Sequence, residues 1–251
     1  MTYTACDNGL RVGLNSIKVS DFLDRRWEWA QPRLISPPGE IHKNWVIFPE
    51  KIKGKYAILH SLTPQIAISY LDSLDFKPGT YLPSYHNGGN GFGREKFWDS
   101  VIRGIGPPPI KTELGWLLFY HAIDRYEPYK YKVGTILVDL EDPRKVIRCS
   151  NSPVLEPEAI YEKSGFKPGV VYLTSAIVND GKLLLYYGAS DSYVCVASCI
   201  LKDFLTALMD NGRDTFIETQ ILPSPSQKKR RVTRPRRTIF SGGITRKQTG
   251  K

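Results

Sequence analysis

The sequence predicts an all-β protein built as a β-propeller. The first observation is a motif that occurs four times along the 251 residues: a strand ending in an aromatic or imidazole ring, then an alternating strand that closes in an acidic turn. The second is its spacing, because copies aligned on Tyr3, His60, Tyr120 and Tyr187 lie 57, 60 and 67 residues apart. A β-meander repeated at a near-constant period is typical of sheets arranged radially around a channel.

Each copy contributes two strands with alternating apolar residues. The first strands are predicted at 2–7, 56–60, 116–124 and 183–191, and the second strands at 12–19, 66–70, 133–138 and 194–201. Such alternation is the pattern expected of strands in a sheet. Helical patterning is weak, apart from a short helix predicted at 204–209.

The first copy lacks the strands that should precede it in a complete blade, because the chain enters a strand at residue 2. A propeller that is not closed exposes the edges of its terminal sheets. We therefore expect that an N-terminal part of the ring has been lost.

The composition is that of a soluble globular protein, with 41% apolar and 24% charged residues. No apolar run is long enough to span a membrane, and the N-terminus does not resemble a signal peptide. These features predict a cytoplasmic protein without membrane partners. The four cysteines are scattered, and Cys195 and Cys199 lack the spacing of a zinc site, so we expect reduced core thiols and no metal.

The net charge of +10 belongs to the C-terminal end of the chain. Residues 228–251 contain ten Lys and Arg and no acidic residue, while the other 25 basic residues are balanced by 25 acidic ones. We therefore expect a neutral propeller domain at 1–222 and a basic, disordered tail at 223–251. The tail is either an arm for nucleic acid or another polyanion, or a solvated extension without a selected role.

The stretch from Arg103 to His121 combines a cationic turn with a buried strand. Glycines and three prolines form a rigid turn between Arg103 and Lys111, and the strand at 116–120 then presents Tyr120 and His121 at its end. Such an arrangement is typical of a sugar or phosphate site. The alternative is a proline-rich connector before an ordinary strand.

Six motifs in order resemble glycoside hydrolase family 130, the β-mannoside phosphorylases and β-mannosidases. They lie at 2–5, 43–56, 103–121, 139–143, 152–157 and 186–191. The resemblance covers residues 1 to about 205 and implies a five-bladed β-propeller, here without its first blade and part of its second. It also implies an oligosaccharide substrate, inorganic phosphate as a co-substrate, and no metal or organic cofactor.

The resemblance assigns the general acid to the position of Asn44, where active family members carry an aspartate. An amide cannot protonate a leaving alkoxide, and the loss of a general acid slows catalysis by about 10²–10⁴-fold. Glu50 is the nearest alternative acid in the sequence. Its competing role is that of a structural acid beside Lys51.

The resemblance assigns phosphate binding to Arg103 and Lys111. It assigns substrate binding to four further residues, Trp45, Tyr120, His121 and Asp191, each of which is alternatively a buried or strand-end residue satisfied by its neighbours. Thr174 stands where the phosphorylases have a histidine, which weakens the case for a complete phosphate pocket.

Two functions follow from this resemblance. The first is a glycosidase or glycoside phosphorylase that cleaves β-mannosides with inversion, using phosphate or water, with the activity of the shortened chain in doubt. The alternative is a non-catalytic carbohydrate-binding propeller, which the amide of Asn44 and the threonine at Thr174 favour. Homo-oligomerisation is compatible with both.

Overall fold

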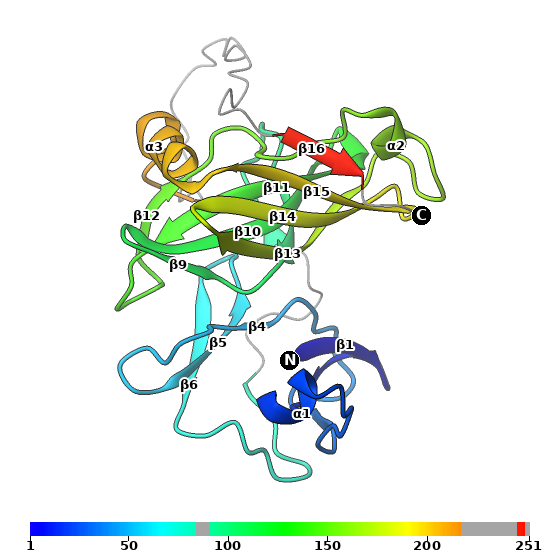
Figure 1. Cartoon of the computed structure of the whole chain (residues 1–251), viewed down its shortest axis with the longest axis vertical. Coiled ribbons are helices and arrows are strands. Elements are labelled where there is room, and N and C mark those ends of the chain that lie inside the picture. The colour runs from blue at the N-terminus through cyan, green and yellow to red at the C-terminus, as the bar shows by residue number, and fades with distance from the viewer. Residues whose placement is uncertain (84–90, 217–244, 249–251) are drawn as a thin grey trace, which may run out of the picture.

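The computed structural model describes residues 1–83, 91–216 and 245–248, which form four antiparallel sheets and three short helices (Figure 1). The first sheet contains β1 (Thr2–Cys6), β2 (Leu10–Leu14) and β3 (Arg33–Leu34), and the second contains β4 (Val46–Ile47), β5 (Tyr56–Ser61) and β6 (Ala67–Leu71). The third has the order β12-β11-β10-β8-β7, with β9 also paired to β10: β7 (Gly91–Phe92), β8 (Val101–Ile105), β9 (Ile110–Thr112), β10 (Gly115–Asp124), β11 (Glu127–Val138) and β12 (Val146–Cys149). The fourth contains β13 (Val171–Asn179), β14 (Lys182–Ala189), β15 (Tyr193–Ile200) and β16 (Thr245–Gln248). The helices are α1 (Val19–Leu23), α2 (Ile160–Lys163) and α3 (Leu201–Asn211).

Neighbouring sheets pack face to face in chain order, and each interface has its own apolar core. The first core joins the first and second sheets, for example through Val12 and Ile58. The second core joins the second and third sheets, and the third core joins the third and fourth. Successive residues of β10 enter different cores, Tyr120 the second and Phe119 the third, because side chains alternate across a strand. The sheets thus follow one another as blades, which confirms the predicted all-β propeller class.

The repeated strands are confirmed at the predicted places. The four first strands become β1, β5, β10 and β14, and three of the four second strands become β6, β11 and β15. The predicted helix at 204–209 lies within α3, whose Phe204, Leu205 and Leu208 are buried against the fourth sheet.

The strand predicted at 12–19 is only partly correct, since β2 ends at Leu14 and Val19 begins α1. After Leu14 the chain leaves the sheet, and the N–H of Ala30 donates to the carbonyl of Ser16 (2.8 Å), which closes the base of the loop at 17–29. Residues of this loop have no neighbouring strand to pair with, so alternation alone does not keep them in a sheet.

Four residues of the predicted disordered tail form a strand, since Thr245–Gln248 (β16) pairs with β15. The remaining residues from 217 onward lie outside the described residues. All four cysteines are free thiols, and Cys149 and Cys195 are buried. The longest helix of the described chain has 11 residues, so none of them can cross a bilayer, which takes about 20.

Candidate functional site

Asn44 and the β8 backbone meet at the boundary between the second and third sheets. Asn44 lies just before β4 with φ +61°, and its Nδ2 donates a hydrogen bond to the carbonyl oxygen of Arg103 (2.8 Å). Gly104 follows with φ +117°, and a Cβ there would overlap the side-chain amide of Asn44. Gly104 is therefore required both for its backbone conformation and for the close approach of the two segments.

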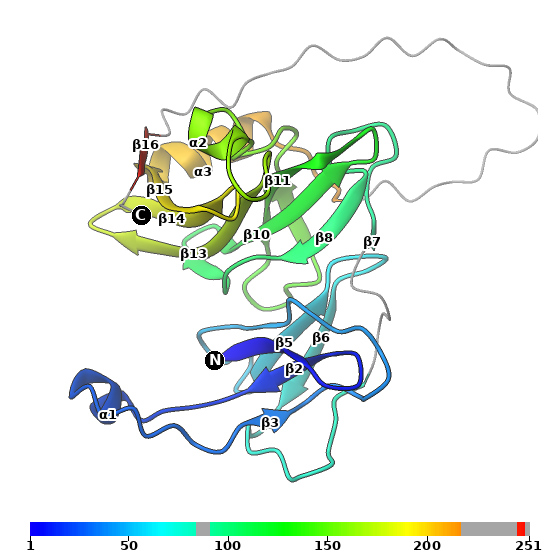
Figure 2. The ribbon, with the colours of Figure 1, turned by 90° about the vertical axis from the view of Figure 1, so that its right-hand side faces the viewer.

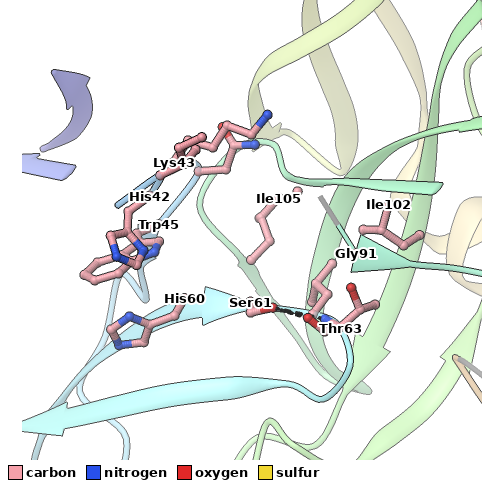
Figure 3. A pocket seen from close by; sticks show the side chains of 13 residues that line it. His42, Lys43, Trp45, His60, Ser61, Thr63, Gly91, Ile102 and Ile105 are labelled. Carbon is pink, nitrogen blue, oxygen red and sulfur yellow. Dashed lines mark hydrogen bonds between the residues drawn. The ribbon is translucent and has the colours of Figure 1, made fainter. Parts of the chain in front are cut away.

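A cavity of about 30 Å³ opens beside this contact (Figure 3). Its wall comes from the segment before β4, the end of β5, and β8. Figure 3 shows His42, Trp45 and His60 gathered on one side, and Ser61, Thr63 and Gly91 on the other. A volume of this size holds one or two waters but not a sugar ring, for which pockets of several hundred Å³ are typical. A sugar would therefore lie over the mouth of the cavity rather than inside it.

Positive charge and tyrosine rings gather next to Asn44. The Nε of Arg103 donates to the hydroxyl of Tyr131 (2.5 Å), and the guanidinium lies 5.2 Å from the centre of that ring. The Nζ of Lys167 lies 6.0 Å from the same ring. Burial, followed by the nearby charge of Arg103, lowers the pKa of Lys43. Within residues 1–83, 91–216 and 245–248, no carboxylate lies within ion-pair distance of Arg103 or Lys167, so the cluster favours an anion.

His121 is held in its neutral form behind this cluster. Its side chain is buried, its Nε2 accepts the N–H of Leu173 (2.9 Å), and its ring stacks on Tyr172 at 4.2 Å and 9°. Burial lowers its pKa to about 3. Because Nε2 accepts a hydrogen bond, the proton of the neutral ring is on Nδ1, and this buried atom has no hydrogen-bond partner among the described residues. His121 is therefore an uncharged, buried ring that packs on Tyr172 and presents almost no surface to a ligand.

Comparisons with known proteins identify the family. A profile of the family described as beta-1,4-mannooligosaccharide phosphorylase matches residues 1–210. The chain belongs to glycoside hydrolase family 130.

The relatives of this family 130 chain include several phosphorylases. It is 42% identical over 168 residues to the 1,2-beta-oligomannan phosphorylase of Thermoanaerobacter sp. (strain X514), an alignment covering 65% of this chain and 52% of the relative. It is 38% identical over 206 residues to the beta-1,2-mannobiose phosphorylase of the same organism, covering 77% of this chain and 64% of the relative. The chain therefore spans about half to two thirds of the length of these relatives.

A solved structure agrees with the fold. The beta-1,2-mannobiose phosphorylase from Listeria innocua, solved with beta-1,2-mannobiose, superposes with a TM-score of 0.67 at 30% identity. The match covers 82% of this chain and 56% of that chain. The four blades of the present structure thus correspond to part of a larger propeller of family 130.

The two predicted phosphate ligands, Arg103 and Lys111, are not brought together. β8 and β9 both pair with β10, but Arg103 lies beside His121 and Lys111 lies opposite Trp116, five residues away along β10. Five strand residues span about 17 Å. Lys111 instead forms an ion pair with Glu50 (2.5 Å).

Glu50 lies apart from Asn44, the position to which the resemblance assigns the family's acid. It lines a second cavity of about 370 Å³ together with Lys111 and the turn at 140–141, beyond the far end of β4 from Asn44. Both side chains of the Glu50 and Lys111 pair are about half exposed. Glu50 is therefore an ion-paired acid, and its partner is Lys111 rather than Lys51.

The structure places Tyr120 in the interior, not at the channel. It is 0% exposed, and its hydroxyl donates to Asp99 (3.0 Å) within the core between the second and third sheets. It faces away from the site because it alternates with His121 along β10. Its buried ring also packs on Gly134, where a Cβ would overlap the ring.

The remaining predicted sugar ligands lie at the margins. Trp45 is 4% exposed and packs edge-on against His60 (4.1 Å), so it forms the cavity wall and offers little surface. Asp191 is exposed in the turn after β14 with φ +49°, next to Ser190, whose carbonyl accepts the N–H of Lys167 (3.0 Å). Asp191 thus lies at the end of the fourth sheet where Lys167 enters the cluster.

The sequence did not predict Lys43, Tyr131, Lys167 or Tyr172 as site residues. Lys43 precedes the position of the acid, and that adjacency was a usable signal. The other three come from separate segments, the β11 strand, the loop before β13, and β13 itself. Only the packing of the third sheet against the fourth brings them together.

Proposed function

We propose that this chain binds β-mannosides over the mouth of the Asn44 cavity and phosphate at the cluster of Lys43, Arg103 and Lys167, as a β-mannoside phosphorylase-type domain. The observation that carries the proposal is the hydrogen bond from Asn44 to the backbone carbonyl of Arg103, whose guanidinium and Lys167 both lie against the ring of Tyr131. The names of the relatives, oligomannan and mannobiose phosphorylases, support this substrate class. Because the chain spans only part of those relatives, the activity of the whole protein is itself a proposal.

The chemistry that this site supports is an inverting phosphorolysis. A phosphate oxygen held by the cluster attacks the anomeric carbon, the bond from that carbon to the glycosidic oxygen breaks on the opposite face, and the leaving oxygen takes up a proton. The cations neutralise the attacking phosphate. The proton is the weak point of the reaction, since the Asn44 amide is not an acid and its Nδ2–H already donates to Arg103.

A second candidate function, mannoside binding without turnover, is favoured by the same hydrogen bond. Asn44 is not simply a vacant acid position, because its amide is built into the packing between β8 and the β4 segment. A carboxylate oxygen in the place of Nδ2 would face the carbonyl oxygen of Arg103, an arrangement that is favourable only for a protonated carboxyl.

The two functions are separated by incubating the full chain and its Asn44→Asp variant with β-1,2- or β-1,4-mannobiose, with and without inorganic phosphate. We expect mannose 1-phosphate from the variant at a rate about 10²–10⁴-fold above that of the parent, because the variant regains a proton donor. Glu50→Gln is the matched control and should leave both rates unchanged. Sugar binding by calorimetry without turnover in either protein would favour the non-catalytic function, and the absence of both binding and turnover would reject the two together.

A further inference from the structure

The hairpin between β10 and β11 contains an irregularity in its strand pairing. The register shifts between Ala122 and Asp124 of β10. Four residues of β11, at 128–131, consequently lie opposite the single residue Ile123, and we call these four residues the bulge. Pro128 begins the bulge and has no N–H to donate to a neighbouring strand. Bulges bend a strand and redirect its side chains, and they are over-represented next to active sites.

The bulge leaves β10 and attaches to the loop before β13. The N–H of Tyr131 donates to the carbonyl of Gly169 (3.0 Å), and Tyr131 forms a parallel bridge with Val170. The backbone also approaches closely at Tyr129, since a Cβ at Gly169 would lie 2.7 Å from its carbonyl oxygen. The third and fourth sheets lie side by side (Figure 2), and the bulge therefore spans the boundary between them.

The two sides of the bulge have different surroundings. Lys130 and Lys132 both donate to the carboxylate of Glu127, at 2.7 and 3.1 Å, so these two side chains lie on one side of β11. Because side chains alternate along a strand, Tyr129 and Tyr131 lie on the other side. The two ion pairs restrain the bulge, and the side that carries the tyrosines is held in one orientation.

Tyr131 belongs to the candidate site. Its hydroxyl accepts from Arg103 (2.5 Å), whose carbonyl accepts from Asn44 (2.8 Å), and its ring centre lies 6.0 Å from the Nζ of Lys167. Tyr129 follows on the same side two strand residues away, a span of about 7 Å. Tyr129 is 83% exposed, whereas Tyr131 is half-buried. Tyr129 therefore extends the aromatic surface of the site outward, onto the rim between the two sheets.

We propose that Tyr129 is a stacking platform for a third mannosyl unit of the substrate, beyond the two units that flank the bond to be cleaved at Asn44. An exposed tyrosine offers an apolar ring face and a hydroxyl, which match the C–H face and the hydroxyl groups of a sugar. The cavity beside Asn44, about 30 Å³, holds no sugar ring, so an oligosaccharide lies over its mouth and continues onto the surrounding surface. The proposal rests on the proposed function, because it assumes that the chain binds β-mannosides at this mouth.

The charges around the platform are paired. Lys130 pairs with Glu127, and Lys132 pairs with both Glu127 and Glu156. Two lysines and two glutamates thus cancel on the side of the bulge away from Tyr129. A neutral aromatic rim suits an uncharged oligosaccharide better than a nucleic acid, which binds largely through unpaired Lys and Arg.

The test is isothermal titration calorimetry of the full chain with mannobiose and mannotriose, each in the β-1,2- and the β-1,4-linked series. Tyr129→Ala removes the platform, Tyr129→Phe keeps the ring, and Tyr126→Ala is the matched control. Tyr126 is a tyrosine of the same hairpin with 76% exposure, but it lies in the turn between β10 and β11, outside the bulge. Circular dichroism of each variant verifies folding.

We expect the parent to bind mannotriose more tightly than mannobiose. Tyr129→Ala should raise the dissociation constant of mannotriose by about 3- to 10-fold, the value of one aromatic contact, and change that of mannobiose less than about twofold. Tyr129→Phe and Tyr126→Ala should bind both sugars like the parent.

The disaccharide separates the failure of this inference from the failure of the proposed function. A parent that binds neither sugar would reject both. A parent that binds mannobiose but does not prefer mannotriose, or a Tyr129→Ala variant that binds mannotriose like the parent, would overturn the inference alone. An equal loss for the two sugars in Tyr129→Ala would also overturn it, because Tyr129 would then support Tyr131 rather than a third unit. So would an equal loss of mannotriose binding in Tyr126→Ala, since the effect would then belong to the hairpin as a whole.

Discussion

Replacing Arg103 should weaken phosphate binding, whereas replacing Lys111 should not. The sequence does not distinguish the two residues as phosphate ligands, since both are basic and they lie only eight positions apart. The structure separates them, because Arg103 lies beside Tyr131 with no carboxylate of the described residues within ion-pair distance, while Lys111 is paired with Glu50 about 17 Å away along β10. The comparison between Arg103→Ala and Lys111→Ala therefore tests the proposed location of the phosphate.

The magnitudes follow from the separation. A hydrogen bond from a charged donor is worth about 1.5–3 kcal/mol, so loss of the Arg103 guanidinium should raise the dissociation constant of phosphate by roughly 10- to 150-fold. At about 17 Å, twice the screening length of physiological salt, the charge of Lys111 should change it less than about twofold. Tyr131→Phe separates charge from packing, because it keeps the ring but removes the hydroxyl that accepts from Arg103. Its effect should be several-fold smaller than that of Arg103→Ala.

Isothermal titration calorimetry with inorganic phosphate at constant ionic strength measures these constants directly. Thermal unfolding with and without phosphate gives an independent measurement, since a ligand that binds the folded state raises the melting temperature. If Lys111→Ala weakens phosphate binding as much as Arg103→Ala does, the anion does not bind at the Arg103 cluster, and the reasoning from the structure is refuted.

Three further predictions concern stability. Gly104→Ala should lower the free energy of unfolding in urea by about 1–3 kcal/mol. Gly79 also has a positive φ but has open space around it, so Gly79→Ala should lower stability less. Equal losses would contradict the close approach of Gly104 to Asn44. Burial lowers the pKa of folded His121 to about 3, so the imidazole binds a proton more readily in the unfolded chain. Acidification from pH 7 to 5 should therefore lower the free energy of unfolding by about 2 kcal/mol, and His121→Gln should not show this loss. An equal loss in the variant would rule out His121 as the cause. Tyr120→Phe should lower stability by about 1–2 kcal/mol, because it removes the donor to buried Asp99, and should leave mannoside affinity unchanged. Weaker mannoside affinity with unchanged stability would instead indicate that Tyr120 contacts the sugar.

Periodicity predicted the strands well because it reflects burial. β5 and β10 each contribute side chains to two apolar cores, and β14 contributes to one. Their apolar residues are therefore fixed by packing and recur in the sequence as strand patterns. The error at 12–19 has the same origin. Residues 12 and 14 are buried in the first core, but those beyond Leu14 have no layer to pack on, so their alternation carries no structural meaning.

The candidate site was predictable only where it follows the chain. Asn44 and Arg103 lie within motifs, and the fold brings them into contact. Distances along a strand were not predictable from proximity in sequence, and the structure separates Lys111 from Arg103 by five residues along β10. The contributions of Lys167 and Tyr172 depend on how one blade packs on the next, for which a single sequence contains no direct signal.

The resemblance places Asn44 where active family members carry an acid, and its amide changes the electrostatics expected of the site. An ionised carboxylate at this position would partly cancel the positive charges of Lys43 and Arg103, whereas the amide adds no charge. The neutral state of His121 acts in the same direction as the amide, since it adds neither charge nor competition for the anion. Under the proposed function, this favours holding phosphate over completing its transfer. Asn44→Asp should speed turnover, because the carboxyl that faces the carbonyl oxygen of Arg103 is favoured in its protonated form and can donate that proton to the leaving oxygen.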